Sequence, residues 1–364
     1  MKKESTPETD VINTAIELAI NWLLYNQSQS EDAGFATYDF SKGWTSSYPE
    51  TSGYIAESFL MWKALSAQER ISNSARRTLD WLVSIQKPSG GWAGGYLAEG
   101  RPEIVFNTGQ ILRGMIQGFL HFKEQKYLSA AQNAADWLVE IQNPAGYWDR
   151  YVYMNAIRVY DTYVSAPLYT LGQVTGKPIY IRAALKNAHW VAGQQLQPNG
   201  WYKNADNSLK YNDKPILHTI AYTLDGLLDI AIQSKDKTLL ESALSTAHAL
   251  AGKLRNEGLL RGRYSNDWTG HGSICNTGVA QTAIIFCKLY IHTCELEWKI
   301  LYFRLINYLL SQQIRTYRDP NMCGALTGSS PIWGRYEPFR LPNWGVKYLI
   351  DALMYYHLII DNDA

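Results

Sequence analysis

One structural unit recurs six times along the 364 residues of this chain. A Thr that opens an apolar helical run returns at intervals of 54 to 58 residues, at Thr51, Thr108, Thr162, Thr219 and Thr277. A sixth apolar run opens at Trp344. In the fourth copy, Ile220, Leu224 and Leu228 share one side of a helix at about 100° per residue, which predicts an apolar face. The opposite side of that helix is polar and carries His218, Tyr222, Asp225 and Asp229.

A second ladder of residues lies between these helix starts. Five aromatic residues are each followed by a Gln five positions later: Trp22, Trp81, Trp137, Trp190 and Tyr308. The Gln residues are Gln27, Gln86, Gln142, Gln195 and Gln313. A further helix, predicted around residues 243–254, keeps the spacing without either residue type. Each unit is therefore a helix, a loop and a second helix, and it buries its apolar face only by packing on its neighbours.

The repeats predict the fold class and the domain organisation. Strand signals are few, and the Gly and Pro turns fall between helices. We therefore expect an all-α fold, an (α/α)6 toroid of six helical hairpins closed into a ring. The repeats continue without a linker, which predicts a single domain over residues 11–364 after a flexible tail over residues 1–10. A long loop from Arg315 to Pro342 precedes the last helix, and loops of this length are commonly functional.

Composition excludes several function classes. The formal net charge is +1 and Lys and Arg do not cluster, so neither nucleic acid nor an anionic membrane surface is an expected partner. No apolar stretch is long enough for a membrane span. The chain start lacks an apolar signal segment and its four Cys show no Cys-x-x-Cys spacing, which predicts a cytoplasmic protein with reduced thiols. No metal-ligand spacing appears, and we predict neither a metal nor a cofactor. The sequence does not indicate the oligomeric state.

The repeat resembles that of a known group of enzymes. Residues 77–92, with Trp81, Gln86 and Trp92, resemble the Gln-Trp repeat of squalene and related terpene cyclases, and residues 137–148 match it again. That family and the protein prenyltransferase β subunits are α/α toroids, so the resemblance implies a ring in which the Gln and the loop Trp tie one unit to the next. Their catalytic Asp-rich motifs are absent, because no two Asp residues are adjacent in this chain.

The predicted ring also resembles six-hairpin carbohydrate enzymes, which include glycosidases, unsaturated glucuronyl hydrolases, sugar 2-epimerases and the helical domain of glucuronyl C5-epimerases. Three stretches look most like toroid proteins encoded with bacterial exopolysaccharide biosynthesis genes. These stretches are Phe106–Gln110, His218–Leu228 and Pro342–Lys347. The resemblance implies polysaccharide biosynthesis and a glycan substrate, without a settled reaction.

The second helices predict a candidate site. If they form the inner ring, they run parallel and their N-termini converge at one mouth, which six positions would encircle: Glu50, Asn107, Asp161, His218, Asn276 and Asn343. Each helix N-terminus carries roughly half a positive unit charge, so the mouth suits an anionic ligand such as a uronic acid. Loop aromatic residues would supply faces for sugar rings. They are Trp44, Trp92, Trp148, Trp201, Trp268, Trp333 and Trp344.

Two reactions fit these residue types. Glycoside hydrolysis needs a protonated carboxylic acid and a second carboxylate, for which Glu50, Asp161 and Glu337 are the candidates. Lyase or epimerase chemistry needs a base to remove the proton beside a uronate carboxylate, and here His218 and Tyr222 would exchange protons. Arg335, Lys347, Asn107 or Asn343 would hold the carboxylate. The remaining predicted substrate-binding residues are Trp44, Gln110, Asp225, Asn276, Tyr336 and Trp344.

Each of these residues also has an ordinary structural interpretation. Asn, Asp and Thr at a helix start commonly cap it, a lone His is often a satisfied buried residue, and Lys347 can pair with Asp351 four positions later. Two other functions fit the same ring. One is an enzyme acting on an isoprenoid or prenyl substrate, and the other is a non-catalytic glycan-binding protein of polysaccharide biosynthesis. The polar mouth favours the polyhydroxylated ligand over the isoprenoid.

Overall fold

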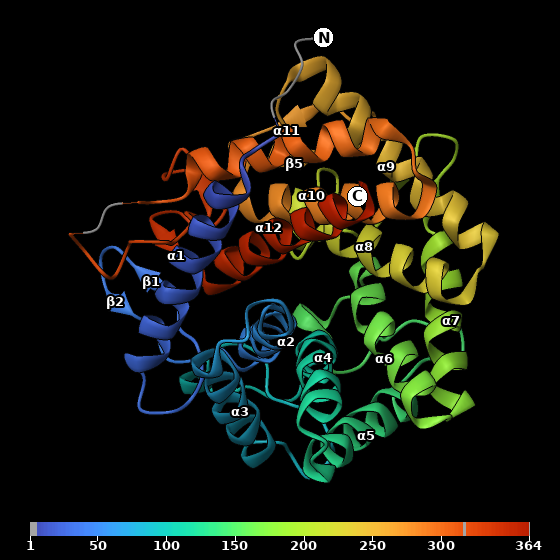
Figure 1. The fold of residues 1–364 in the computed structure, drawn as a ribbon. Coiled ribbons are helices and arrows are strands. Elements are labelled where there is room, and N and C mark those ends of the chain that lie inside the picture. The colour runs from blue at the N-terminus through green and yellow to red at the C-terminus, as the bar shows by residue number, and fades with distance from the viewer. Residues whose placement is uncertain (1–5, 316–317, 364) are drawn as a thin grey trace.

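The computed structural model describes residues 6–315 and 318–363, and its helices form two concentric rings (Figure 1). The inner ring consists of α2 (Pro49–Ser66), α4 (Val105–Phe122), α6 (Thr162–Thr175), α8 (Leu217–Ser234), α10 (Asn276–Thr293) and α12 (Asn343–Asp363). The outer ring consists of α1 (Thr9–Ser28), α3 (Glu69–Ser84), α5 (Gln125–Glu140), α7 (Pro178–Ala192), α9 (Lys237–Glu257) and α11 (Leu296–Gln312). Neighbouring inner helices pack all the way round, because α12 also contacts α2. The predicted all-α (α/α)6 toroid is confirmed.

Each inner helix forms a tight hairpin with the outer helix that follows it. The connections are two residues long, and the first connecting residue adopts a left-handed conformation that ends the helix. These residues are Ala67, Lys123, Gly176, Lys235 and Cys294. The sixth pair joins the two ends of the chain, since α12 packs against α1. The long connections therefore run from outer to inner helices and collect at the end where the inner helices begin.

The inner helices are buried nearly all round. In α8, Leu224, Leu227 and Leu228 lie in the hydrophobic core that the two rings share. The polar side of the same helix is also buried, because His218 and Asp225 face the lumen of the ring. The expected polar face is therefore not an open helix surface but part of a nearly closed interior.

The predicted Gln ladder ties neighbouring outer helices together. The Nε2 atom of Gln86 donates to the carbonyl of Gly90 in its own loop and to that of Ala130 on α5, at 2.8 and 2.9 Å. Gln142 repeats the pattern on α7 at Ala183. Gln313 closes the ring, since its Nε2 atom donates to the carbonyl of Ala15 on α1. The repeat is structural, as its resemblance implied.

Short strands organise the loops over the mouth. A three-stranded sheet joins β1 (Tyr38–Asp39), β2 (Gly43–Trp44) and β9 (Arg340–Leu341), with Tyr38 opposite both Trp44 and Leu341. The two-stranded sheets are β3 (Gln195–Leu196) with β4 (Trp201–Tyr202), β5 (Arg263–Tyr264) with β6 (Gly270–His271), and β7 (Ile274–Cys275) with β8 (Ser329–Ser330). Four short 3-10 helices are η1 (Leu97–Glu99), η2 (Tyr153–Asn155), η3 (Val159–Asp161) and η4 (Leu209–Tyr211). The last loop is thereby fixed against the first and fifth connections.

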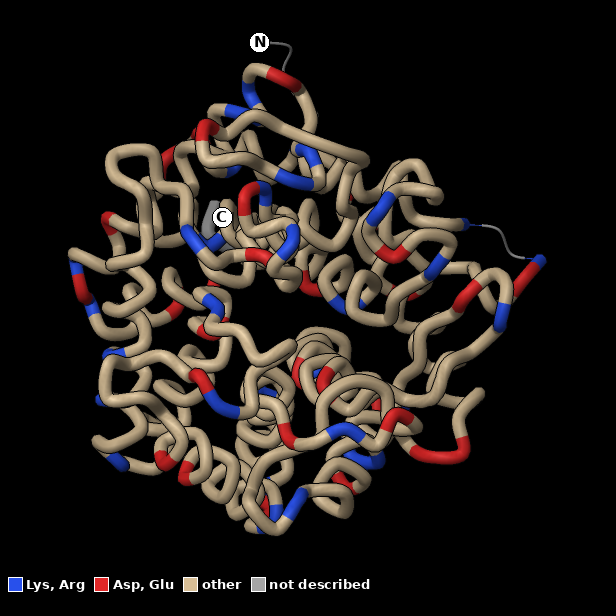
Figure 2. The backbone as a smooth tube through the Cα atoms, turned by 180° about the vertical axis from the view of Figure 1, so that it is seen from behind, with Lys and Arg blue, Asp and Glu red and all other residues tan. Residues whose placement is uncertain are grey.

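Charged residues of both signs lie around the ring, and part of the predicted N-terminal tail packs against it. Lys and Arg alternate with Asp and Glu around the ring (Figure 2). Within residues 6–315 and 318–363, no helix is long and apolar enough to cross a membrane. The predicted tail of residues 1–10 is partly outside the described residues, and α1 already begins at Thr9. The carbonyl of Pro7 accepts a hydrogen bond from the Tyr356 hydroxyl, so this part of the expected tail contacts α12.

Candidate active site

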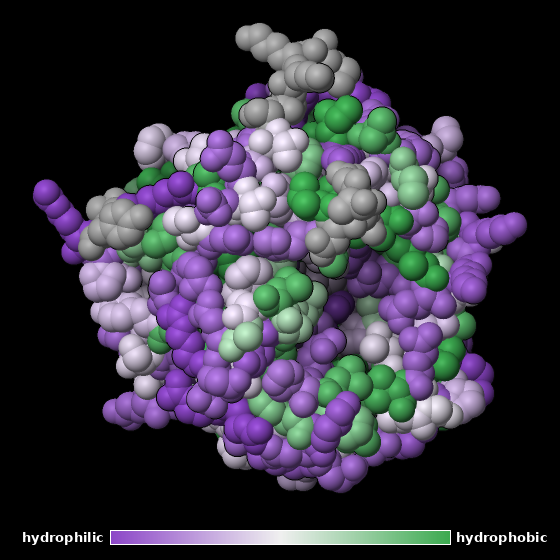
Figure 3. Space-filling model, viewed as in Figure 1, coloured by the Kyte–Doolittle hydropathy of each residue, from purple (hydrophilic) through white to green (hydrophobic). Residues whose placement is uncertain are grey.

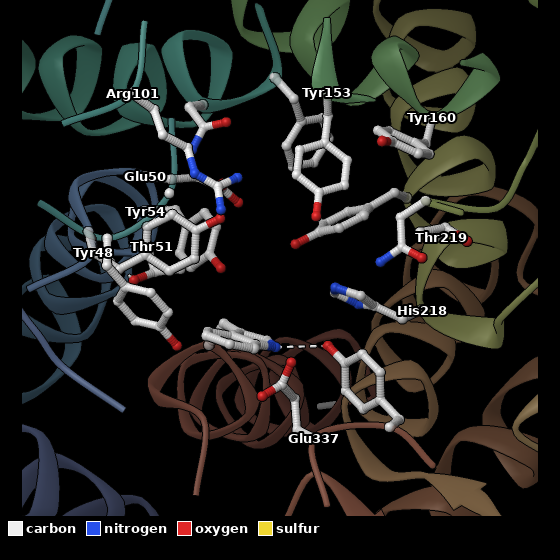
Figure 4. A pocket seen from close by; sticks show the side chains of 18 of the residues that line it. Tyr48, Glu50, Thr51, Tyr54, Arg101, Tyr153, Tyr160, His218, Thr219 and Glu337 are labelled. Atoms are coloured by element: carbon white, nitrogen blue, oxygen red, sulfur yellow. Dashed lines mark hydrogen bonds between the residues drawn. The ribbon is translucent and has the colours of Figure 1, made fainter. Parts of the chain in front are cut away.

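A cavity of about 240 Å³ opens at the mouth where the inner helices begin. Seven of the predicted site residues line it: Glu50, Asn107, His218, Tyr222, Tyr336, Glu337 and Trp344. Figure 4 shows Glu50 on one side of this cavity and His218 on the opposite side. The convergence of inner-helix starts, inferred from the repeat, thus brings about half of the predicted residues to one place.

His218 is positioned as a neutral base. It is the second residue of α8 and is 8% exposed. Its Nδ1 atom lies 2.7 Å from Oε1 of Gln281 on α10, and because that oxygen only accepts, this contact favours the tautomer with the proton on Nδ1. Burial lowers the pKa of His218 to about 4, so the ring is uncharged near neutral pH. The other nitrogen, Nε2, then has a lone pair for accepting a proton.

Glu50 is positioned as an acid. It is the second residue of α2, where the preceding loop ends, and is 6% exposed. Burial raises the pKa of Glu50 to about 7, and the nearby Tyr48 hydroxyl opposes this only in part. A substantial fraction of Glu50 is therefore protonated at neutral pH, which is the state required of a general acid.

Glu337 enters the cavity from the last loop and is held by an arginine. Oε2 of Glu337 accepts from Nη1 of Arg340 at 3.1 Å, and Nε of Arg340 also donates to Asp39 on β1 at 2.9 Å. Burial raises the pKa of Glu337, while the Arg340 guanidinium opposes the rise. The sheet between the first and last loops thus fixes this second carboxylate at the rim.

Tyrosine rings form the floor of the cavity. The ring of Tyr222 lies 4.6 Å from that of Tyr163 on α6 and 4.3 Å from that of His218. Burial raises the pKa of Tyr222 well above its usual value, so its hydroxyl stays protonated. At the rim, Nε1 of Trp344 donates to the Tyr336 hydroxyl at 2.7 Å. Hydroxyl groups and aromatic faces therefore surround the space between Glu50 and His218.

Two predicted binding residues lie deeper in the ring. Asp225 and Lys347 line a second cavity and not the mouth. Asp225 pairs with Lys288 on α10 at 2.6 Å, and Lys347 pairs with Asp351 at 2.6 Å, as the spacing of four residues allowed. Both residues were predicted to bind substrate at the mouth. They lie instead further along the axes of α8 and α12, away from the helix N-termini.

Four other predicted binding residues also lie outside the mouth cavity. The side-chain amide of Asn276 is held by Thr327 and the Tyr308 hydroxyl. Trp44 packs on Trp22 and donates to Asn321. Gln110 and Asn343 are fully buried and do not line the cavity.

The other residues that were predicted to act at the mouth do not line its cavity. Asp161 is 3% exposed beside Tyr160, which does line the cavity, and burial raises the pKa of Asp161 to about 8. Arg335 is exposed and lines a neighbouring cavity that shares Tyr336 with the mouth. The loop residues Trp92 and Trp148 are fully buried, because their indole N–H groups donate to carbonyls of the preceding outer helices. Neither of these two indoles is available to a sugar.

The Asn, Asp and Thr side chains at the starts of the inner helices do not cap them. α4 and α8 begin before the predicted residues, α10 begins at Asn276 itself, and Asp161 is the N-cap residue of α6. None of these four N-cap residues makes a side-chain cap hydrogen bond. The hydroxyl of Thr219 instead donates back to the carbonyl of Ile216. Asn107, the third residue of α4, therefore lines the cavity without serving as a cap.

Sequence reasoning missed several residues of the lining. Arg101 extends into the cavity on the side of Glu50, where its guanidinium also contacts Glu99 (Figure 4). Tyr48, Tyr54 and Tyr96 complete that wall. Tyr54 follows Glu50 by four residues on the same face of α2, which is a usable signal, whereas no periodic pattern points to Arg101. Within the part of the chain that the structure describes, no group of three or more His, Cys, Asp or Glu residues is arranged to hold a metal ion.

Comparison of the sequence with protein families gives no assignment. No family model matches the chain, and no curated protein matches its sequence. Comparison of the structures does find relatives of the same shape. An unsaturated glucuronyl hydrolase specific for heparin superposes with a TM-score of 0.77 at 15% identity, over 97% of this chain and 99% of that one.

Two further structures agree over nearly their full length. The unsaturated glucuronyl hydrolase of Bacillus sp. GL1, responsible for the degradation of glycosaminoglycan, gives a TM-score of 0.73 at 14% identity, over 94% of this chain and 96% of that one. Cellobiose 2-epimerase from Bacillus thermoamylovorans gives 0.73 at 11% identity, over 95% and 98%. At such identities the likeness establishes the (α/α)6 toroid fold of this chain and leaves its activity to be argued from the site.

Proposed function

We propose that this protein is a carbohydrate-active enzyme that hydrolyses a glycosidic bond next to a uronic-acid residue. One observation carries the proposal. Glu50 and His218 line opposite sides of one cavity, and their pKa values are shifted so that a substantial fraction of the carboxyl is protonated at neutral pH while the imidazole is neutral. Titratable groups pushed in opposite directions within one cavity are typical of acid and base catalysis.

The two groups have complementary roles in hydrolysis. Glu50 gives its proton to the glycosidic oxygen as the bond from that oxygen to the sugar carbon breaks. His218 takes a proton from water at Nε2 as the water oxygen bonds to the same sugar carbon. A later exchange with solvent returns the proton from His218 and restores Glu50. Glu337 is held by Arg340 at the rim, and its part is to bind substrate hydroxyls.

The substrate class follows from the charges of the mouth. Six inner helices begin around it, and their N-terminal ends favour an anion. Arg101 adds N–H donors at the rim, and its side chain is 43% exposed, so it is accessible to a substrate carboxylate. Trp344 and the tyrosines of the lining provide faces and hydroxyl groups for a sugar ring. The folds of the glucuronyl hydrolases support the same substrate class.

A second candidate is proton abstraction from the carbon beside the uronate carboxylate, as in a lyase or an epimerase. The observation that favours it is the contact between the rings of His218 and Tyr222, at 4.3 Å, with the Tyr222 hydroxyl kept protonated. His218 would take the proton and Tyr222 would return one, or protonate the leaving oxygen. The fold of a sugar epimerase is compatible with this chemistry.

The test follows saturated and unsaturated uronyl disaccharides by ultraviolet absorbance. A double bond conjugated to the carboxylate absorbs, so hydrolysis of an unsaturated disaccharide lowers absorbance, whereas a lyase raises it with a saturated substrate. Proton exchange in heavy water, read by NMR, detects an epimerase. Glu50→Gln and His218→Ala are expected to abolish hydrolysis. Full turnover by both variants would exclude the proposed pair.

A thermal-shift measurement with the same sugars and with prenyl diphosphates separates the two other functions that the sequence allows. A glycan-binding protein would be stabilised by the sugars and leave all of them unchanged. An isoprenoid enzyme would be stabilised by prenyl diphosphates instead. A role in polysaccharide biosynthesis and a cytoplasmic location stay predictions from the sequence, as does the domain boundary at residue 11.

A further inference from the structure

A second cavity of about 260 Å³ lies at the opposite end of the lumen. Tyrosines separate it from the mouth. The Tyr348 hydroxyl lies 3.3 Å from the Tyr163 hydroxyl, and Tyr163 packs on Tyr222, which belongs to the floor of the mouth cavity. Figure 3 shows a hollow near the middle of the molecule with hydrophilic residues inside it. The ring therefore has a second recess that the proposed hydrolysis does not use.

The basic residues of this second cavity are already partnered. Nζ of Lys288 contacts both Asp225 and Asp229 at 2.6 Å. Nζ of Lys347 contacts Oδ2 of Asp351 at 2.6 Å. Arg113 donates to the carbonyl of Tyr163 at 2.9 Å and stacks on its ring at 3.9 Å. Lys288 and Lys347 are thus paired with carboxylates, whereas Arg113 bonds a carbonyl and is close enough to Glu57 for the two charges to attract each other.

In contrast, some carboxylate oxygens of this cavity accept no hydrogen bond from the described residues. Asp351 is 7% exposed, and its Oδ1 atom has no hydrogen-bond partner within the described chain. Glu57 on α2 also lines the cavity and forms no ion pair among residues 6–315 and 318–363. Four carboxylates thus face three cations, which leaves one formal negative charge. A buried carboxylate oxygen without a donor is a group that a ligand can satisfy.

The surroundings favour the same kind of ligand. The C-terminal ends of the inner helices lie at this end of the ring and carry partial negative charge. An apolar groove adjoins the cavity and shares Met61 and Tyr355 with it, while Leu65 and Leu358 line its outer part. A ligand here would meet acceptor oxygens inside and apolar side chains outside.

We propose that this recess is a second binding site, for a small alkylammonium or alkylguanidinium cation. Its N–H groups would donate to the free Oδ1 atom of Asp351 and to the carboxylate of Glu57, and its alkyl part would lie in the apolar groove. The site is independent of the proposed hydrolysis. This site favours a cation, whereas the mouth favours an anion.

The test measures binding of four matched probes by calorimetry and thermal shift: butylammonium, butylguanidinium, butyrate and butanol. The two cations are expected to bind with saturation, and the anion and the alcohol are not. In Glu57→Gln the cations are expected to bind about tenfold to a hundredfold more weakly, because a charged hydrogen bond is lost. Among the residues that the structure describes, Glu57 forms no ion pair that the substitution would break, and Gln keeps the shape of the side chain, so this variant is expected to fold.

Two further variants make the result specific. Asp351→Asn is expected to weaken cation binding as well, whereas Glu50→Gln, at the other end of the ring, is expected to leave it unchanged. Hydrolysis of a uronide at the mouth should show the reverse pattern, lost in Glu50→Gln and kept in Glu57→Gln and Asp351→Asn, so failure here is distinguishable from failure of the proposed hydrolysis. Absence of saturable cation binding would overturn the inference, as would equal binding by the wild type and Glu57→Gln.

Discussion

The Nδ1 atom of His218 and the Oε1 atom of Gln281 lie 2.7 Å apart on neighbouring inner helices, and this contact fixes which ring nitrogen is free. Gln281 is a positioning residue, because it acts through the imidazole. Gln281→Glu places a negative charge at the same position and should raise the pKa of His218. At neutral pH part of the base is then protonated and inactive.

The expected result is an acidic limb of the kcat/KM profile that moves to higher pH in Gln281→Glu. An NMR titration of His218 should show the same displacement of its pKa. Gln281→Met, which removes the acceptor without adding charge, is the control and should lower the rate without that displacement. An unchanged pH profile in Gln281→Glu would mean that His218 is not the base.

The pH dependence of the wild-type activity follows from the two shifted groups. His218 must be deprotonated and has a pKa of about 4, whereas Glu50 must be protonated and has a pKa of about 7. The rate should therefore rise as pH increases through about 4 and fall as pH increases through about 7. Initial-rate measurements of kcat/KM across this range check the prediction. A rate that still climbs at pH 9 would contradict the assignment of Glu50 as the acid.

Glu50→Gln tests the same acid more directly. Gln keeps the shape of the side chain and cannot donate a proton of comparable acidity. We expect kcat to fall by about 10²- to 10⁴-fold with little change in substrate affinity. Substrates with a good leaving group, such as nitrophenyl uronides, should recover much of the loss because they need no acid. Equal losses on both kinds of substrate would instead indicate a misfolded site.

The buried carboxyl of Asp161 should make the free energy of unfolding depend on pH. Burial raises its pKa from 3.8 to about 8, so the folded protein holds a proton that the unfolded chain has already released above pH 3.8. This group therefore contributes less to stability as pH rises between those values. Asp161→Asn should gain roughly 5 kcal/mol at pH 8, the free energy that corresponds to a pKa change from 3.8 to about 8, and little at pH 4. Urea unfolding at both values measures this, and a loss at pH 8 would show that Asp161 is ionised and stabilised by Arg158.

The ring and half of its mouth were predictable because both depend on local spacing. Helix starts that recur along the chain place Glu50, Asn107, His218 and Trp344 at one end, whatever the loops do. Asp225 was wrongly placed at the mouth. Periodicity shows which side of the helix a residue faces, but not that two residues on that side lie at the same position along the axis. Seven residues after His218, a helix has advanced by about 10 Å. Asp225 therefore reaches the second cavity.

The loop residues were predictable only in part. Tyr336 and Glu337 were singled out by the composition of the long last loop, whereas Arg101 was not, since a loop path depends on contacts between distant segments. The hydrogen bond between Arg340 and Asp39 is one such contact, and its partners are 301 positions apart in the sequence. The shifted pKa values of Glu50 and Asp161 were also outside the reach of the sequence, because burial inside the ring produces them.

The closure of the ring offers a last prediction. Gln313 follows α11 and is buried, and its Nε2 atom donates to the carbonyls of Ala15 at 2.8 Å and Gly324 at 3.2 Å. Gln313→Ala leaves both carbonyls without this donor, and should cost about 1–3 kcal/mol of unfolding free energy. Within the described residues, the side chain of the adjacent Gln312 bonds only Ser311 beside it, so Gln312→Ala is the matched control and should change stability by less than about 0.5 kcal/mol. Equal effects of the two substitutions in urea unfolding would show that the ladder does not hold the first and last outer helices together.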